Sequence, residues 1–154
     1  MGIEIERKFL LKNDSWKNKA DKGTSIKQGY LNSNKHRTVR VRIAGASGFL
    51  TIKGKNEHLT RQEFEYDIPL EEALSLLELC EKPIIEKTRF IVSDHGNDWE
   101  VDVFGGENEG LLLAEIELKS EEQALTTPNW IGEEVSTDER YYNSSLIANP
   151  FKNW

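Results

Sequence analysis

The sequence has almost no cysteine to cross-link the fold, and it has no apolar run long enough to span a membrane. Its 154 residues include one cysteine, Cys80, so an internal disulfide and a cysteine-based zinc site are excluded. The longest stretch without a charged side chain, residues 141–151, is polar, whereas a membrane span needs about 20 apolar residues. Residues 1–6 carry acids where a signal peptide carries bases, so we expect a cytoplasmic protein with no membrane partner.

Runs of basic residues are also missing. The chain has 20 Lys and Arg against 27 Asp and Glu, a formal net charge of −7, which disfavours a nucleic-acid surface. We therefore expect no nucleic-acid partner. The 4 prolines are widely spaced, and neither a repeat nor a linker-like tract divides the chain. At about 150 residues per domain, the length predicts a single domain over residues 1–154.

What the sequence does have is a regular alternation of apolar and charged residues. This alternation predicts strands near residues 2–11, 24–32, 37–44, 48–55, 61–68, 83–93, 98–104 and 111–119. Helices are predicted to begin at Pro69, at Ser120 and at Ser136, the last running toward Ala148, with a further turn at 13–20. Many short strands and few helices favour a mainly β fold, either an antiparallel barrel or a sandwich.

The charged residues of these strands share one face, because residues i and i+2 of a strand point the same way. The acids on this face are Glu4, Glu6, Glu63, Glu65, Asp67, Glu100, Asp102, Glu115 and Glu117, and the bases are Lys8, Arg40, Arg42, Lys53, Lys55, Lys87, Arg89 and Lys119. An ordinary solvent-facing sheet is polar too. Here, however, most strands carry like charges two residues apart, and these repel each other unless something bound cancels the charge.

Paired carboxylates and paired cations suit two different ligands. Carboxylate oxygens are hard ligands for Mg²⁺ or Mn²⁺. Arginine and lysine side chains hold phosphate oxygens, arginine in bidentate geometry. A face that carries both predicts a site for a metal-bound polyphosphate. The alternative is the solvated face of an ordinary acidic β-domain.

The motif Glu4-Ile5-Glu6-Arg7-Lys8 resembles the N-terminal ExExK signature of the CYTH superfamily, also called triphosphate tunnel metalloenzymes. Further motifs follow in the family's order, from residue 3 to about 147: Gln28-Gly29-Tyr30-Leu31, Arg40-Val41-Arg42, Thr51-Ile52-Lys53-Gly54-Lys55, Glu63-Phe64-Glu65, Lys87-Thr88-Arg89, Asp102 and Glu115-Ile116-Glu117. The resemblance implies a mainly β (α+β) fold. In it, an eight-stranded antiparallel closed β-barrel forms a charged tunnel, with a few flanking helices.

The resemblance also implies an activity, namely divalent-metal-dependent hydrolysis of a triphosphate with Mg²⁺ or Mn²⁺. The chain is most similar to the short bacterial members, which are mainly inorganic tripolyphosphatases releasing pyrophosphate and phosphate. Activity of the class IV adenylyl cyclase or thiamine triphosphatase type is an alternative on the same tunnel. A non-catalytic polyphosphate- or nucleotide-binding module is another. A homodimer is compatible with the family and with the need to cover apolar outer surface.

Roles for individual residues follow from the resemblance. Arg40, Arg42, Lys53, Lys55, Lys87 and Arg89 are expected to bind the phosphates, and Glu4, Glu6, Glu63, Glu65, Asp102, Glu115 and Glu117 to bind metal. Lys8, Lys87, Glu4 and Glu6 are expected to be catalytic, with Lys8 contacting the phosphate nearest the metal end. The segment 141–148 is expected to lie near a tunnel mouth and to gate it.

Overall fold

The computed structural model describes residues 2–154 of the protein. Its strands are β1 (Gly2–Leu11), β2 (Thr24–Asn32), β3 (Arg37–Ala44), β4 (Ser47–Gly54), β5 (Thr60–Ile68), β6 (Ile85–Asp94), β7 (Asn97–Phe104), β8 (Leu112–Glu117) and β9 (Ile131–Glu134). The α-helices are α1 (Leu70–Leu79) and α2 (Ser145–Ala148), and the 3₁₀ turns are η1 (Ser15–Lys19), η2 (Gly106–Asn108), η3 (Glu139–Tyr141) and η4 (Phe151–Asn153). None of these helices is long and apolar enough to cross a membrane.

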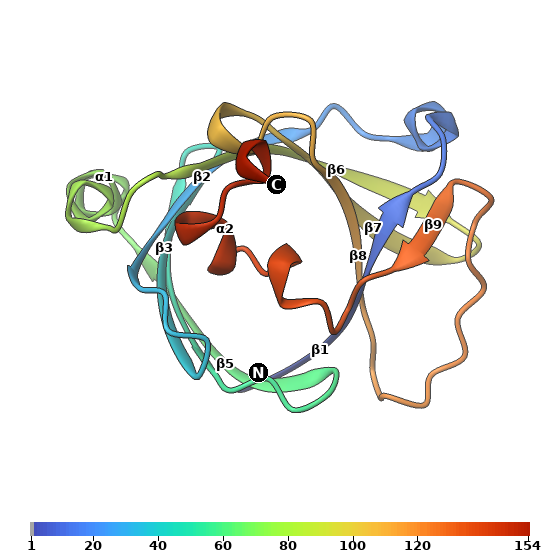
Figure 1. The fold of residues 1–154 in the computed structure, drawn as a ribbon, viewed down its shortest axis with the longest axis horizontal. Helices are drawn as coiled ribbons and strands as arrows, with labels where there is room; N and C mark the ends of the chain where they lie inside the picture. Colours follow the sequence, from blue (N-terminus) through green and yellow to red (C-terminus); the bar gives the residue numbers. More distant parts are fainter. Residues whose placement is uncertain (1) are drawn as a thin grey trace.

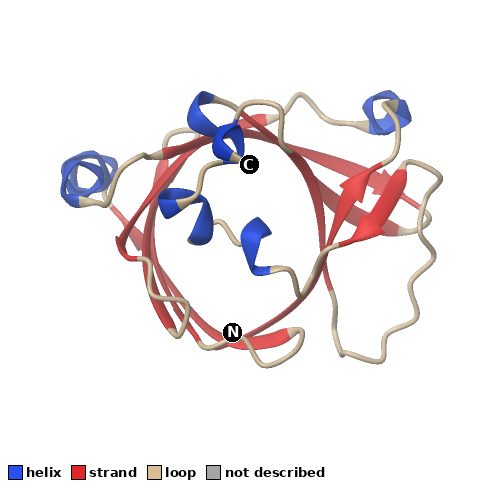
Figure 2. Cartoon of the chain, in the orientation of Figure 1, coloured by secondary structure: helices blue, strands red, loops and turns tan. Residues whose placement is uncertain are grey.

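The strands form a closed antiparallel barrel, which Figures 1 and 2 show as a ring around a central opening. The order around the ring is β5-β4-β3-β2-β6-β7-β8-β1, and pairing of β1 with β5 closes it into the predicted eight-stranded barrel. Strand β1 closes the ring because it is long enough to serve two neighbours. Its residues 2–5 pair with β5 and its residues 6–9 pair with β8. Closure removes the two free edges that an open sheet would expose.

The apolar side of the strands faces outward and is covered locally by the remaining elements. Helix α1 buries Ala73, Leu77 and Cys80 against Val41 and Ile43 of β3. The helix can approach this closely because two wall positions opposite it are glycines. A Cβ at Gly29 would lie 2.7 Å from the Cβ of Cys80, and one at Gly48 would lie 2.8 Å from the Cβ of Ala73.

A second outer cluster is aromatic and lies where β9 and η1 cover β1, β6 and β7. Trp99 packs edge-on against both Phe9 and Trp130, with ring centroids 5.6 Å apart in each pair. Trp16 of η1 lies against Phe90. These two clusters lie outside the ring of strands. A third apolar cluster lies inside the ring, where Ile85, Phe104 and Leu113 pack with Leu146 and Ile147 of α2. The rest of the barrel interior is left to polar side chains.

We predict that Asp94 stabilises this cluster. Its Oδ2 accepts a 2.9 Å hydrogen bond from Trp130 Nε1, which lowers the pKa of the Asp94 carboxyl, and Lys19 lies 3.2 Å from Oδ1. Replacement by alanine leaves the buried indole N–H of Trp130 without an acceptor. It should lower the free energy of unfolding by about 1–3 kcal/mol. The ionised carboxylate contributes fully above its unfolded pKa of about 3.9, and the contribution is lost as pH falls through the lower folded value.

Urea unfolding at neutral pH and at about pH 3 would check this, because the difference between wild type and Asp94→Ala should shrink in acid. Asp98→Ala is the matched control, since Asp98 is exposed on the same hairpin. It should change the free energy of unfolding by less than about 0.5 kcal/mol. Equal stability of wild type and Asp94→Ala at neutral pH would contradict the prediction.

The observed elements confirm the eight predicted strands and the helix after Pro69, but correct two other helices. No helix follows Ser120, where the chain turns and Gln123 Oε1 accepts a hydrogen bond from the backbone of Lys119. The helix expected from Ser136 to Ala148 is broken into η3 and α2, because Asp138 caps η3 and the chain is extended at Tyr142. The sequence pattern also missed the four-residue strand β9.

Candidate functional site

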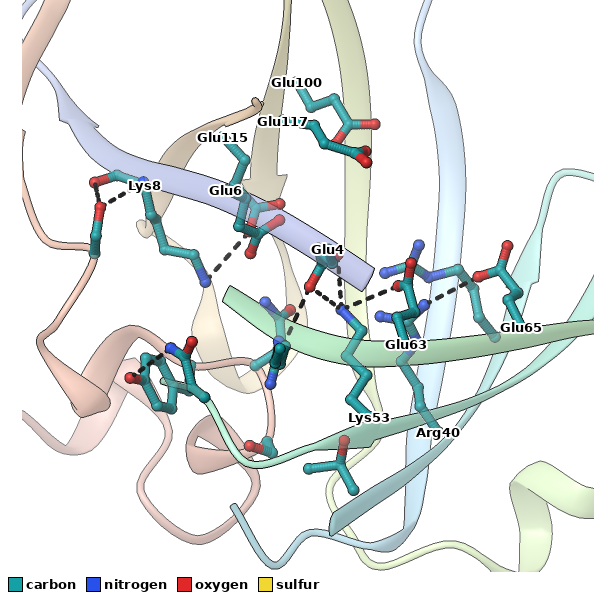
Figure 3. Close-up of a pocket in the computed structure, with 18 of the residues that line it drawn as sticks. Glu4, Glu6, Lys8, Arg40, Lys53, Glu63, Glu65, Glu100, Glu115 and Glu117 are labelled. Atoms are coloured by element: carbon teal, nitrogen blue, oxygen red, sulfur yellow. Dashed lines mark hydrogen bonds and ion pairs between the residues drawn. The ribbon is translucent and has the colours of Figure 1, made fainter. Parts of the chain in front are cut away.

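A cavity of about 240 Å³ runs inside the barrel, and its lining is almost entirely charged or polar. The predicted residues that line it are Glu4, Glu6, Lys8, Arg40, Arg42, Lys53, Glu63, Glu65, Lys87, Arg89, Glu115 and Glu117, together with Glu100 of the same charged face. They come from β1 and β3 to β8, so the charged face of the strands points inward. Figure 3 shows acidic and basic groups meeting across this space. The alternative of an ordinary solvated outer face is therefore wrong.

Opposite charges from different strands pair across the cavity. Lys53 Nζ lies 3.1 Å from Glu4 and 3.5 Å from Glu63, as the dashed lines of Figure 3 mark. Lys8 Nζ lies 3.3 Å from Glu115. The like charges within each strand are thus partly compensated by charges of other strands, which the sequence alone did not reveal.

One part of the lining keeps an excess of negative charge. The strand register sets Glu6 directly opposite Glu117, and Glu100 directly opposite Glu115. Burial, together with the nearby carboxylates of Glu115 and Glu4, raises the pKa of Glu6 to about 8. A carboxyl that holds its proton so strongly lies where a bound cation would relieve repulsion.

Another part keeps an excess of positive charge. Burial lowers the pKa of Lys87 to about 7, and Arg89 and Arg42 act in the same direction against the pull of Asp102. Burial and the neighbouring guanidinium groups of Arg40 and Arg89 also lower the pKa of Arg42. The Nε of Arg40 is buried and has no hydrogen-bond partner among residues 2–154. Three such cations held together are arranged for an anion with several oxygens.

Asp102, a predicted metal ligand, is paired with two of the predicted phosphate-binding cations. Its side chain is 1% exposed, lies beneath the cavity lining, and accepts 2.7 Å bonds from Lys87 Nζ and from Arg89 Nε. A third bond at 2.8 Å joins Arg89 Nη2 to Oδ2. Because both carboxylate oxygens are engaged by cations, Asp102 orients Lys87 and Arg89 in this structure, and its metal-binding role stays a prediction.

Lys55 lies apart from the other predicted phosphate-binding residues. Strand β4 ends at Gly54, so the alternation that points Lys53 inward stops before Lys55, which is exposed and outside the cavity lining. Asp67 and Lys119 lie outside the lining as well.

Several lining residues were missed from the sequence. Arg61 of β5 shares a face with Glu63, and its Nε lies 3.2 Å from Glu4. The segment after β9 contributes Ser136, Tyr142, Asn143 and Ser144. In Figure 1 this segment lies within the ring of strands, which confirms the predicted location at a tunnel mouth. Whether it gates that mouth stays a prediction.

The acidic part of the lining fits a divalent cation. Among residues 2–154, no three acidic, His or Cys side chains are gathered into a ready-made coordination group. Mg²⁺ is usually held by one or two carboxylates plus substrate phosphates rather than by a complete protein cage. Glu6 and Glu117, which form no ion pair within the part of the chain that the structure describes, supply hard oxygen donors beside the cations that would hold phosphate. This donor set suits Mg²⁺ or Mn²⁺.

The fold and the site together define a closed β-barrel whose tunnel is lined by acidic and basic side chains. Comparison with known proteins assigns the family, because the CYTH domain model matches residues 2–147. The chain belongs to the CYTH domain family. A protein of Acetivibrio thermocellus named inorganic triphosphatase is 50% identical over 100% of this chain and 99% of its own. Another of that name, from Nitrosomonas europaea, is 37% identical over 93% of this chain and 95% of its own.

Solved structures agree with this assignment. The inorganic triphosphatase NE1496 superimposes with a TM-score of 0.66 at 35% identity, covering 94% of this chain and 93% of that one. Protein PH1012 of Pyrococcus horikoshii gives a TM-score of 0.59 at 18% identity over 77% of this chain and 79% of its own, which supports the fold alone.

Proposed function

We propose that the protein hydrolyses inorganic triphosphate to pyrophosphate and phosphate, in a reaction that depends on a divalent cation, with Mg²⁺ or Mn²⁺ as the metal. The observation that carries this proposal is the pair of uncompensated regions in one tunnel. Burial and the surrounding acids raise the pKa of Glu6, while burial and the surrounding cations lower the pKa values of Lys87 and Arg42. A metal-bound polyphosphate relieves both at once. The two relatives named inorganic triphosphatase support the same substrate.

We propose the following roles for individual residues in this hydrolysis. Arg40, Arg42 and Arg89 bind phosphate oxygens, and the ammonium of Lys87 holds its proton against the charge that develops in the transition state. Asp102 fixes the directions of Arg89 and Lys87. Glu115, Glu117, Glu4 and Glu6 are the candidate ligands for metal, with Glu63 and Glu65 adjoining them. A bound divalent cation supplies charge neutralisation and lowers the pKa of its water.

The lining favours an inorganic chain over a nucleotide. Ligand pockets for organic groups are lined mainly by apolar and aromatic side chains. Here the non-polar contribution to the cavity is confined to Leu59 and the rings of Tyr30 and Tyr142. The described residues thus offer no apolar recess for a purine or a thiamine ring next to the phosphate-binding cations.

Purified protein would be incubated with tripolyphosphate, ATP or thiamine triphosphate, each with Mg²⁺, with Mn²⁺ and with EDTA. We expect equimolar phosphate and pyrophosphate from tripolyphosphate, abolished by EDTA, and far slower turnover of the other two. Cyclic AMP from ATP would replace this proposal with the cyclase alternative. Tight binding without turnover would support the binding-module alternative.

Three broader features belong to the same proposal: residues 1–154 act as a single domain, the partner is a small triphosphate, and the setting is cytoplasmic. A homodimer is also proposed, because large apolar side chains remain exposed on the outer wall. They include Phe64 and Tyr66 of β5, which are 43% and 55% exposed. Sedimentation equilibrium of wild type and Tyr66→Lys would test the dimer, and a monomeric wild type would contradict it.

A further inference from the structure

The segment that follows β9 is held inside the barrel mouth by polar bonds to residues of the site. Lys8 Nζ donates to the backbone carbonyl of Tyr141 at 3.1 Å. Asn56, just after β4, donates to the hydroxyl of Tyr142 at 3.2 Å. The next residue, Asn143, makes the most central contacts. The segment therefore takes part in the site as well as covering its end.

Asn143 connects two of the cations that face the cavity. Its Oδ1 accepts one hydrogen bond from Lys87 Nζ at 3.1 Å and another from Gln28 Nε2 at 3.2 Å. Gln28 is fully buried, and its Oε1 accepts a 2.8 Å bond from Arg42 Nε. A continuous chain of bonds therefore runs from Arg42 through two amides to Lys87 and ends at Asp102.

The direction of both amides follows from their partners. Lys87 can only donate, so Asn143 must present its oxygen to it, and Gln28 must then present its nitrogen to Asn143 and its oxygen to Arg42. The Nδ2 of Asn143 is left as a donor beside the cavity that the residue lines. The hydrogen-bonded series from Arg42 to Lys87 then presents only donor groups to a bound anion.

We propose that Asn143 is a positioning residue for the anion site: its neutral carboxamide holds Lys87 and, through Gln28, Arg42, with their donors aimed at one phosphate group. The site's identity as a triphosphate site rests on the proposed function. A neutral amide is suited to this task because it orients cations without neutralising them. A carboxylate at the same place would pair with Lys87 and repel the anion.

Two substitutions separate orientation from charge. Asn143→Asp keeps an oxygen for Lys87 and Gln28 but adds a negative charge. We expect it to raise KM for tripolyphosphate by about tenfold or more, while the melting temperature stays near that of wild type. Asn143→Leu keeps the volume but removes the acceptor. It should lower kcat/KM by about 10- to 100-fold, because Lys87 and Gln28 lose their common partner.

Asn149→Asp and Asn149→Leu are the matched controls, because Asn149 is exposed in the same segment and does not line the cavity. Both should behave as wild type. A binding measurement keeps the test independent of turnover. Calorimetric titration with tripolyphosphate in EDTA should show weakened affinity for Asn143→Asp and wild-type affinity for Asn149→Asp. Should wild type bind tripolyphosphate without hydrolysing it, the proposed function fails and this calorimetric comparison still decides the role of Asn143. Unchanged KM and unchanged affinity in Asn143→Asp would overturn the inference.

Discussion

Glu115→Gln is expected to lower kcat for tripolyphosphate by about two to three orders of magnitude. Burial raises the pKa of the Glu115 carboxyl, but Lys8 and Arg89 outweigh burial and hold it well below its ordinary value. Glu115 is therefore ionised at neutral pH, with Lys8 at 3.3 Å and Arg89 at 3.0 Å. Glutamine keeps the shape but removes the charge that orients both cations and that a divalent metal would require.

Steady-state kinetics over a range of Mg²⁺ concentrations would measure this effect. The Mg²⁺ concentration that gives half-maximal activity should also be higher for Glu115→Gln than for wild type. Glu122→Gln makes the same chemical change on an exposed residue and should leave kcat unchanged. Circular dichroism would establish that the folded fraction is equal in both variants. A Glu115→Gln protein with wild-type kcat and wild-type metal dependence would contradict the proposed role of Glu115 in the site.

The tunnel could be predicted from the sequence because strand alternation is strictly local. Glu4 and Glu6, or Arg40 and Arg42, share a face whatever the rest of the chain does, and the structure places them all in the cavity lining. The same rule failed at Lys55 because alternation holds only within a strand, and β4 ends at Gly54. Strand ends depend on turn geometry, which the charge pattern does not record.

Pairing between strands could not be predicted, because it depends on the register around the closed ring. Asp102 looked like a free carboxylate until β7 was placed beside β6, where Arg89 lies directly opposite. Arg61 could have been found, since it precedes Glu63 by two residues on the same strand. Asn143 could not, because it lies in a turn and reaches the site only through the path of the C-terminal segment.

Lys87→Ala is expected to lower kcat by about three orders of magnitude. The Lys87 side chain is 0% exposed and lies 2.7 Å from Asp102, and it also bonds Asn143 at 3.1 Å. Alanine removes the ammonium that we propose binds the phosphates, and it leaves Asp102 with Arg89 alone. Lys87→Arg keeps the charge but not the compact geometry, so it should fall between alanine and wild type in kcat.

A pH series adds a second readout. Because the pKa of Lys87 in the free protein is about 7, a bound polyanion must raise it, and binding above neutral pH takes up a proton. Tripolyphosphate affinity of wild type, measured by calorimetry, should therefore weaken as pH rises from about 7 to 9. Lys87→Arg should show a smaller pH dependence because a guanidinium stays protonated over more of this range, while Glu6, with a pKa of about 8, still ionises within it.

Lys27→Ala serves as the control for both measurements. Lys27 is exposed on β2, one residue before Gln28, and its alternation directs it away from the tunnel. It should match wild type in kcat and in the pH dependence of binding. A Lys87→Ala protein that is folded and turns over at the wild-type rate would show that the phosphates do not depend on this ammonium. The assignment of the cationic side of the tunnel as the anion site would then have to be abandoned, since Lys87 is its most buried member.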